Sequence, residues 1–258
     1  AGRGAPAEHA FALAADEVKS FATSLALALR RHYAPLASGD ASTERCTERV
    51  DDDLLFARVH KPLMGLFARR YQDDEARLAA KLQQFVTVSP AHLGIKQPFW
   101  LLPDDIAAIT EPPYYKAIRQ LQQLPKLLAP HRKVACLVEV AKLIVQCIEE
   151  HYAGRTDVPA EKLQVGGDEL VPLFTFVCIK ARVPSLYAES AFMERYIPDS
   201  LAIAQGGYTL ATLQTCLSFI QMLQLEQIEE SAQPILEKIL ASKHSSFASR
   251  PPADFSIE

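Results

Sequence analysis

The amino-acid sequence predicts an all-α protein, a helical bundle followed by a layered all-helical domain. Apolar residues recur at helical spacing along most of the chain, whereas alternation of apolar and polar residues is nearly confined to residues 85–88. With 258 residues and 49% hydrophobic content, the chain can bury a sizeable core. Asparagine is absent, so no Asn-Gly pair is available for a tight β-hairpin turn.

The first 110 residues are expected to form an N-terminal helical bundle. Its first helix runs from about residue 8 to residue 33 and ends in a polar loop. Acidic runs at residues 51–53 and 73–75 open two further helices, because carboxylates favour the positive N-terminal end of a helix. Pro62 is expected to kink the second of these helices.

A proline-rich stretch at residues 98–113 follows. Its four prolines stand among apolar residues and lack the Gly/Ser flexibility of a linker, so it is expected to be a packed connector between two helical layers, with Trp100 as a core plug. Further helices are expected at residues 114–128, 131–151, 169–182, 189–196, 209–225 and 227–243. The chain then divides into a bundle at 1–110, a second domain at 111–225, a C-terminal helix packing on the core at 226–244, and a flexible tail at 245–258.

Charge and composition exclude several classes of partner. The net charge is −4, from 27 basic and 31 acidic residues, with no block of like charge, so nucleic acid is not an expected partner. No apolar run reaches the ~20 residues of a membrane span. The first residues lack both an initiator Met and a signal-peptide pattern, and the chain looks like a piece of a longer protein. Five cysteines without CxxC spacing indicate free thiols in the reducing cytosol.

The common catalytic and cofactor motifs are missing. The sequence contains no GxGxxG, P-loop, HExxH or GxSxG motif and no Glu-x-x-His pair for a di-metal bundle, so no cofactor and no metal are expected. The seven scattered histidines are interpreted as structural. The acidic pairs Asp104-Asp105 and Glu149-Glu150 are interpreted as helix starts or solvated faces rather than as a general acid and base.

Two double-glycine segments depart from this pattern. Asp168 follows Gly166-Gly167 at a helix start, which alone is typical of an N-cap, but Pro172 removes a hydrogen bond from the first turns of the same apolar helix. In the second segment, a further Gly-Gly pair precedes Tyr208 at the start of another helix. The two segments together suggest a surface that engages a partner.

The order of these motifs resembles the vacuolar-protein-sorting-nine domain family. The resemblance is carried by Gly167-Asp-Glu-Leu-Val-Pro172, Ile179-Lys-Ala181 with Pro184 and Leu186, Phe192-Met-Glu-Arg-Tyr196, Gly207-Tyr208, Phe219-Ile220 and, upstream, Ala129-Pro-His-Arg-Lys-Val134 with Cys136-Leu137. It spans about residues 114–225, and residues 50–95 resemble more weakly the helical bundle that precedes this domain in Rabex-type proteins.

The resemblance implies guanine-nucleotide exchange on small GTPases of the Rab-five subfamily, without covalent chemistry, by a cytoplasmic protein recruited to early endosomal membranes in endocytic vesicle trafficking. Position by position, the acidic finger of the family falls on Asp168, its groove proline on Pro172 and its tyrosine on Tyr208. The family threonine aligns with Ala211, and Thr212 follows one position later, so both are expected at the partner surface.

Two other interpretations remain open at this stage. A non-catalytic helical adaptor could keep the Rab-binding groove without exchange activity, and the alanine at residue 211 supports it. A helical enzyme is the third possibility, and metal analysis of the purified protein would test it.

Overall fold

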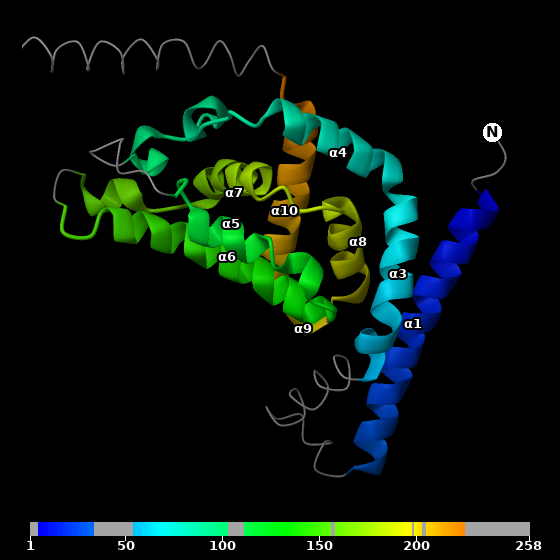
Figure 1. Cartoon of the computed structure of the whole chain (residues 1–258). Coiled ribbons are helices and arrows are strands. Elements are labelled where there is room, and N and C mark those ends of the chain that lie inside the picture. Colours follow the sequence, from blue (N-terminus) through cyan, green and yellow to red (C-terminus); the bar gives the residue numbers. More distant parts are fainter. Residues whose placement is uncertain are drawn as a thin grey trace, which may run out of the picture.

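A computed structural model describes residues 5–33, 54–102, 111–155, 158–197, 199–202 and 205–224 (Figure 1). All regular elements in these residues are helices, so the all-α prediction is confirmed. No described helix combines the length and apolar character needed to cross a lipid bilayer. The helix expected at 227–243 and the tail at 245–258 lie outside the described residues, as do the acidic residues 51–53.

Three long helices form the N-terminal part of the chain. Helix α1 spans Ala5–His32, α3 spans Ala57–Arg70 after a short π-helical turn at 54–56, and α4 spans Gln72–Gln84. Helix α3 continues through Pro62. Three acidic residues lie in the first turn of α4, as the sequence predicts, and Figure 1 shows α1 lying alongside α3.

Two short 3₁₀ helices lie before and at the start of the proline-rich connector, of which the structure describes residues 98–102 and 111–113. These are η3 (Pro90–Leu93) and η4 (Gln97–Trp100). Phe99 is fully buried, and its carbonyl oxygen accepts a hydrogen bond from the Tyr114 hydroxyl at 2.5 Å. The half-buried Trp100 donates its indole N–H to the carbonyl oxygen of Ile95 at 2.6 Å, as expected of a packed side chain. Asp104 and Asp105 lie outside the described residues.

Eight further helical elements follow, and most lie close to the predicted ranges. They are α5 (Tyr115–Leu121), η6 (Leu124–Lys126), α6 (Pro130–His151), η7 (Ala160–Leu163), α7 (Gly167–Ala181), α8 (Leu186–Tyr196), α9 (Asp199–Ala202) and α10 (Gln205–Met222). The single helix expected at 114–128 is wrong: α5 ends at Leu121, and a separate 3₁₀ turn contains Pro125. Helix α10 begins four residues earlier than predicted, because its two glycines are helical.

Two hydrophobic cores join the N-terminal helices to the rest of the chain. The larger core brings α4 together with α5, α6, α7 and α10. The smaller one packs α1 and α3 against α8, through edge-to-face contacts between Phe56 and Phe192 and between Phe67 and Phe192, both at 5.7 Å between centroids. Such aromatic pairs add to the stabilisation from apolar burial. The first helices and α8 therefore share one core.

A buried ion pair crosses the interior between α6 and α8. The Lys133 ammonium lies 2.6 Å from a Glu189 carboxylate oxygen, and the two side chains are 0% and 3% exposed. Lys133 also donates to the carbonyl oxygen of Leu124 at 3.0 Å and lies over the Phe192 ring. Burial lowers the pKa of Lys133 and raises that of Glu189, while their mutual attraction acts in the opposite direction.

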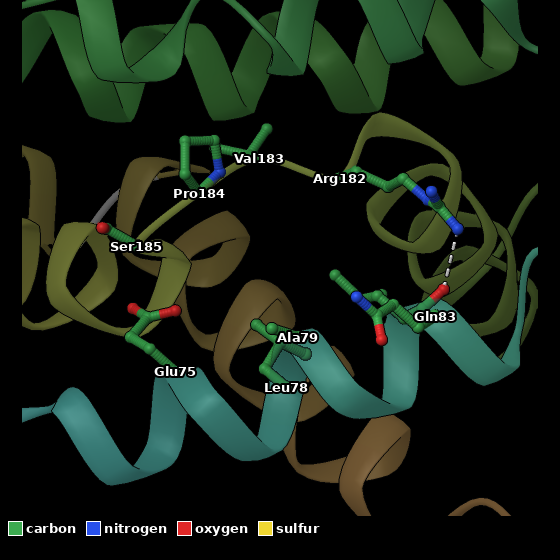
Figure 2. A pocket seen from close by; sticks show the side chains of 9 residues that line it. Glu75, Leu78, Ala79, Gln83, Arg182, Val183, Pro184 and Ser185 are labelled. Carbon is green, nitrogen blue, oxygen red and sulfur yellow. Dashed lines mark hydrogen bonds between the residues drawn. The ribbon is translucent and has the colours of Figure 1, made fainter.

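Charged side chains also hold α4 against the loop between α7 and α8. Arg182 donates to the carbonyl oxygen of Leu82 at 3.0 Å, and Glu75 accepts the backbone N–H of Ala188 at 3.0 Å in the first turn of α8. A pocket of about 330 Å³ lies between these contacts (Figure 2). Burial raises the pKa of Glu75, although the N–H groups of α8 oppose the shift.

Candidate functional site

The first turn of α7 is capped by a different residue from the one the sequence suggested. Gly166 is the N-cap, and its N–H donates to Glu169 Oε2 at 3.1 Å in a capping-box arrangement. The interpretation of Asp168 as the N-cap is therefore wrong. Asp168 is the second residue of the helix, and its side chain is exposed with no hydrogen-bond or ion-pair partner among the described residues.

Glu169 also contacts Lys96, which lies two residues before the connector. Lys96, the residue that precedes η4, donates to Glu169 Oε1 at 2.6 Å. This hydrogen bond holds the pKa of Glu169 below its usual value and raises that of Lys96, and the nearby negative charge of Asp168 raises the pKa of Lys96 further. Of the two neighbouring carboxylates at the start of α7, only that of Asp168 is left unpaired.

Pro172 lies inside α7 without breaking it. It lacks the N–H that would otherwise bond the carbonyl oxygen of Asp168, so the lost bond is the third of the helix rather than the first. The side chain is half-buried, and the seven residues after it, 173–179, are fully buried. Packing of this segment compensates for the missing bond and keeps the helix continuous.

The double glycine of α10 allows close approach of neighbouring helices. A Cβ at Gly206 would lie 2.7 Å from Val134 Cγ1, and one at Gly207 would overlap the carbonyl oxygen of Ala202 in α9. The sequence predicted a loop here, but both glycines are within the first turn of the helix. Their small size therefore serves packing rather than a turn.

Tyr208 lies next to the start of α7. Its side chain is 53% exposed, and its hydroxyl lies 3.2 Å from the position that a Cβ would take on Gly167. The two double-glycine segments, about 40 residues apart in the sequence, therefore meet at one corner of the surface. Asp168 and Tyr208 are both exposed at this corner.

Ala211 and Thr212 lie on different sides of α10. Ala211 is exposed on the same face as Tyr208, three residues along the helix. Thr212 is only 5% exposed, and its hydroxyl donates to the carbonyl oxygen of Tyr208 at 2.9 Å. The exposed face continues along the helix with Thr215 and Ser218.

Residues 114–225 match the Vacuolar sorting protein 9 (VPS9) domain. This segment of the chain is a VPS9 domain. Its boundaries fit the structure closely, because α5 begins at Tyr115 and α10 ends at Met222. The capped start of α7 and the exposed face of α10 both lie within the VPS9 domain, whereas α1, α3, α4 and Lys96 precede it.

Relatives of known name agree with this assignment. The human protein named VPS9 domain-containing protein 1 is 28% identical over 193 residues, which are 71% of this chain and 30% of the relative. Vacuolar protein sorting-associated protein 9A of Arabidopsis thaliana is 26% identical over 222 residues, 82% of this chain and 38% of the relative. Mouse Ras and Rab interactor 2 is 25% identical over 177 residues, 66% of this chain and 17% of the relative. The chain thus spans about a third of the length of the first two.

The four cysteine thiols of the VPS9 domain are buried. Burial raises the pKa of Cys136 to about 11 and that of Cys216 to about 12, which disfavours the thiolate that nucleophilic chemistry would need. The described residues include no cluster of three or more His, Cys, Asp or Glu that could hold a metal. Glu150, one of the acidic pair in α6, is engaged by Lys116 and Gln146.

Three contributors to the VPS9 site were missed by reasoning from sequence. Glu169 could have been found, because a glutamate three residues into a helix can accept the backbone N–H of the N-cap residue. The sequence places Gly167 at a helix start but does not reveal that the Tyr208 hydroxyl lies against it. Lys96 is 73 residues from its partner, and no local sequence signal connects the two.

Proposed function

We propose that the VPS9 domain of this chain is a guanine-nucleotide exchange factor for Rab GTPases of the Rab-five subfamily. The observation that carries the proposal is the carboxylate of Asp168, which has no partner among the described residues and is exposed in the first turn of α7 beside the exposed ring of Tyr208. The names of the relatives called Ras and Rab interactor support a Rab GTPase as the partner.

Asp168 would act by charge in the nucleotide site of the GTPase. Such a site holds GDP through a P-loop lysine, a magnesium ion and backbone N–H groups, with roughly 12–16 kcal/mol of binding free energy. A carboxylate inserted there repels the β-phosphate, disfavours magnesium binding and gives the lysine a substitute partner. Factor and nucleotide therefore weaken each other's binding reciprocally. No covalent bond forms or breaks.

Neighbouring residues would supply the contact surface. Tyr208 and Ala211 present one exposed face of α10, and Pro172 lies half-buried behind Asp168 on α7. We propose that this surface holds the switch regions of the GTPase away from the nucleotide. Thr212 remains part of the proposed region. Its hydroxyl donates to the carbonyl oxygen of Tyr208 within the same helix, so we propose that Thr212 acts by holding the backbone of Tyr208 in place.

The cellular setting follows from the partner. An exchange factor for this subfamily would act in the cytoplasm and be recruited peripherally to early endosomal membranes. A fluorescent fusion that stays away from Rab-five-positive membranes would contradict this part of the proposal.

One observation favours a second function. The resemblance aligns the threonine of the family with Ala211, whose methyl group cannot donate a hydrogen bond to the partner. A non-catalytic Rab-binding adaptor would keep the apolar and aromatic contacts and lose nucleotide release. The two functions differ in one measurement, the rate of GDP dissociation.

The test is release of fluorescent GDP from a panel of Rab-five-type GTPases with catalytic amounts of the protein. Wild type should accelerate release, and Asp168→Ala and Asp168→Asn should abolish the acceleration. Because Asp168 is not the N-cap, both variants should unfold within about 0.5 kcal/mol of wild type. Glu161→Gln, a change of similar charge at an exposed position just before α7, is the matched control and should keep full activity.

Binding to the nucleotide-free GTPase separates the alternatives. Tight binding without acceleration on any member of the panel would establish the adaptor and refute exchange. An active Asp168→Ala variant would remove the acidic finger from the mechanism. Tyr208→Ala should weaken the nucleotide-free complex by about 2 kcal/mol, as expected of an aromatic hot spot.

A further inference from the structure

The Glu169 carboxylate joins two parts of the chain. One oxygen accepts the N–H of Gly166 at 3.1 Å, and the other accepts the Lys96 ammonium at 2.6 Å. Lys96 is 68% exposed and Glu169 20% exposed, so the pair lies at the surface with its carboxylate end partly covered. Lys96 itself precedes the VPS9 domain in the sequence.

The first turn of α7 has few internal restraints. Leu170 N–H bonds the carbonyl oxygen of Gly166 at 2.9 Å, but Pro172 leaves the carbonyl oxygen of Asp168 without its helical donor. The N–H groups of residues 167–169 have no partner within the helix, as at any helix start. The bridge from Lys96 through Glu169 to Gly166 is therefore a main tether of the turn that contains Asp168.

We propose that Lys96 is a positioning residue for Asp168, acting through Glu169; this inference rests on the proposed exchange function. The ammonium fixes the capping carboxylate and neutralises its charge. The first turn of α7 then presents a single unneutralised carboxylate in a fixed direction. Lys96, which precedes the VPS9 domain, thereby sets how efficiently the domain releases GDP.

The effect is expected to be local. An exposed ion pair contributes little to global stability, so Lys96→Gln should leave the melting temperature almost unchanged. The same substitution should make amide hydrogen exchange at Gly166 faster, because its acceptor is no longer held. In the GDP-release assay it should lower the maximal rate about two- to fivefold, the range expected for loss of one surface ion pair.

A double-mutant cycle tests the route through Glu169. In Glu169→Gln protein, adding Lys96→Gln should change neither the GDP-release rate nor exchange at Gly166. Lys96→Arg, which can still pair with the carboxylate, should keep wild-type behaviour in both measurements. Lys162→Gln is the matched control, because Lys162 is exposed in η7, shortly before α7, and its side chain has no ion-pair or hydrogen-bond partner among the described residues.

The outcomes separate this inference from the proposed function. Equal losses from Lys96→Gln with and without Glu169, or an equal loss from Lys162→Gln, would show general charge attraction to the GTPase and overturn the inference. Unchanged amide exchange at Gly166 would overturn it as well, even in protein without GDP-release activity. Inactive wild-type protein whose Gly166 amide exchanges faster in Lys96→Gln would refute the exchange function and retain the tether.

Discussion

Replacement of His60 by leucine should make the protein more stable and less sensitive to acid. His60 is 9% exposed and lies edge-to-face against Phe192 at 5.4 Å, and its Nε2 atom is buried without a hydrogen-bond partner among the described residues. Burial, and then the nearby charge of Lys133, lowers its pKa from 6.5 to about 4. The histidine is therefore neutral in the folded protein at physiological pH.

The magnitude follows from this pKa. The unfolded chain takes up the proton near pH 6.5 and the folded chain only near pH 4, so the free energy of unfolding decreases as the pH falls through this window. Between pH 7.5 and pH 5 His60 alone should remove about 2 kcal/mol. At pH 7.5 His60→Leu should also gain about 1 kcal/mol, because no unpaired ring nitrogen is buried.

The assay is urea unfolding of wild type, His60→Leu and His60→Gln at pH 7.5 and pH 5. Both variants lack the titrating group, so each should lose about 2 kcal/mol less than wild type between the two pH values. Only His60→Leu should exceed wild type at pH 7.5, because glutamine keeps buried polar atoms. Equal acid sensitivity of all three proteins would refute the reasoning.

Three further substitutions test packing, the buried charge and the partner surface. Gly207→Ala should destabilise the protein by more than about 2 kcal/mol in thermal unfolding, because the added methyl group would overlap the backbone of Ala202; a neutral effect would mean that α9 can move away. Glu189→Gln should cost about 3–5 kcal/mol in urea unfolding by leaving Lys133 buried and unpaired, and a loss below about 1 kcal/mol would show that the pair is not ionised. Ala211→Thr should raise the efficiency of GDP release by up to about tenfold, because a hydroxyl on this exposed face can bond the GTPase, and no gain would argue against this face as the contact surface.

The helices of the VPS9 domain were largely predictable from the sequence. Residues 131–151 and 169–182 were expected as helices and form α6 and α7 with small shifts at their ends. Their apolar spacing continues over many turns, so the pattern is strong. The face shared by Tyr208 and Ala211 was also predictable, because residues three apart in a helix are neighbours.

The details at the helix ends were not predictable in the same way. Asp168 and Glu169 are both acidic residues in the first turn, and the residue at which the helix begins decides which carboxylate can accept the N–H of the N-cap residue Gly166. The early start of α10 was missed because glycine usually ends a helix, whereas Gly207 is required by the close approach of α9. The Lys96–Glu169 contact depends on tertiary structure alone.

The residues that hold α4 in place are made long after α4 itself during translation. The Glu75 carboxylate accepts the backbone N–H of Ala188, which lies 113 residues later in the sequence. The Arg182 guanidinium donates to the carbonyl oxygen of Leu82, which lies 100 residues earlier. At a translation rate of about 5–20 residues per second, the segment from Arg182 to Ala188 is synthesised roughly 5–25 s after α4. During that interval Leu78 and Leu82 of the nascent chain should stay exposed and accessible to ribosome-associated chaperones, because their core partners are still missing.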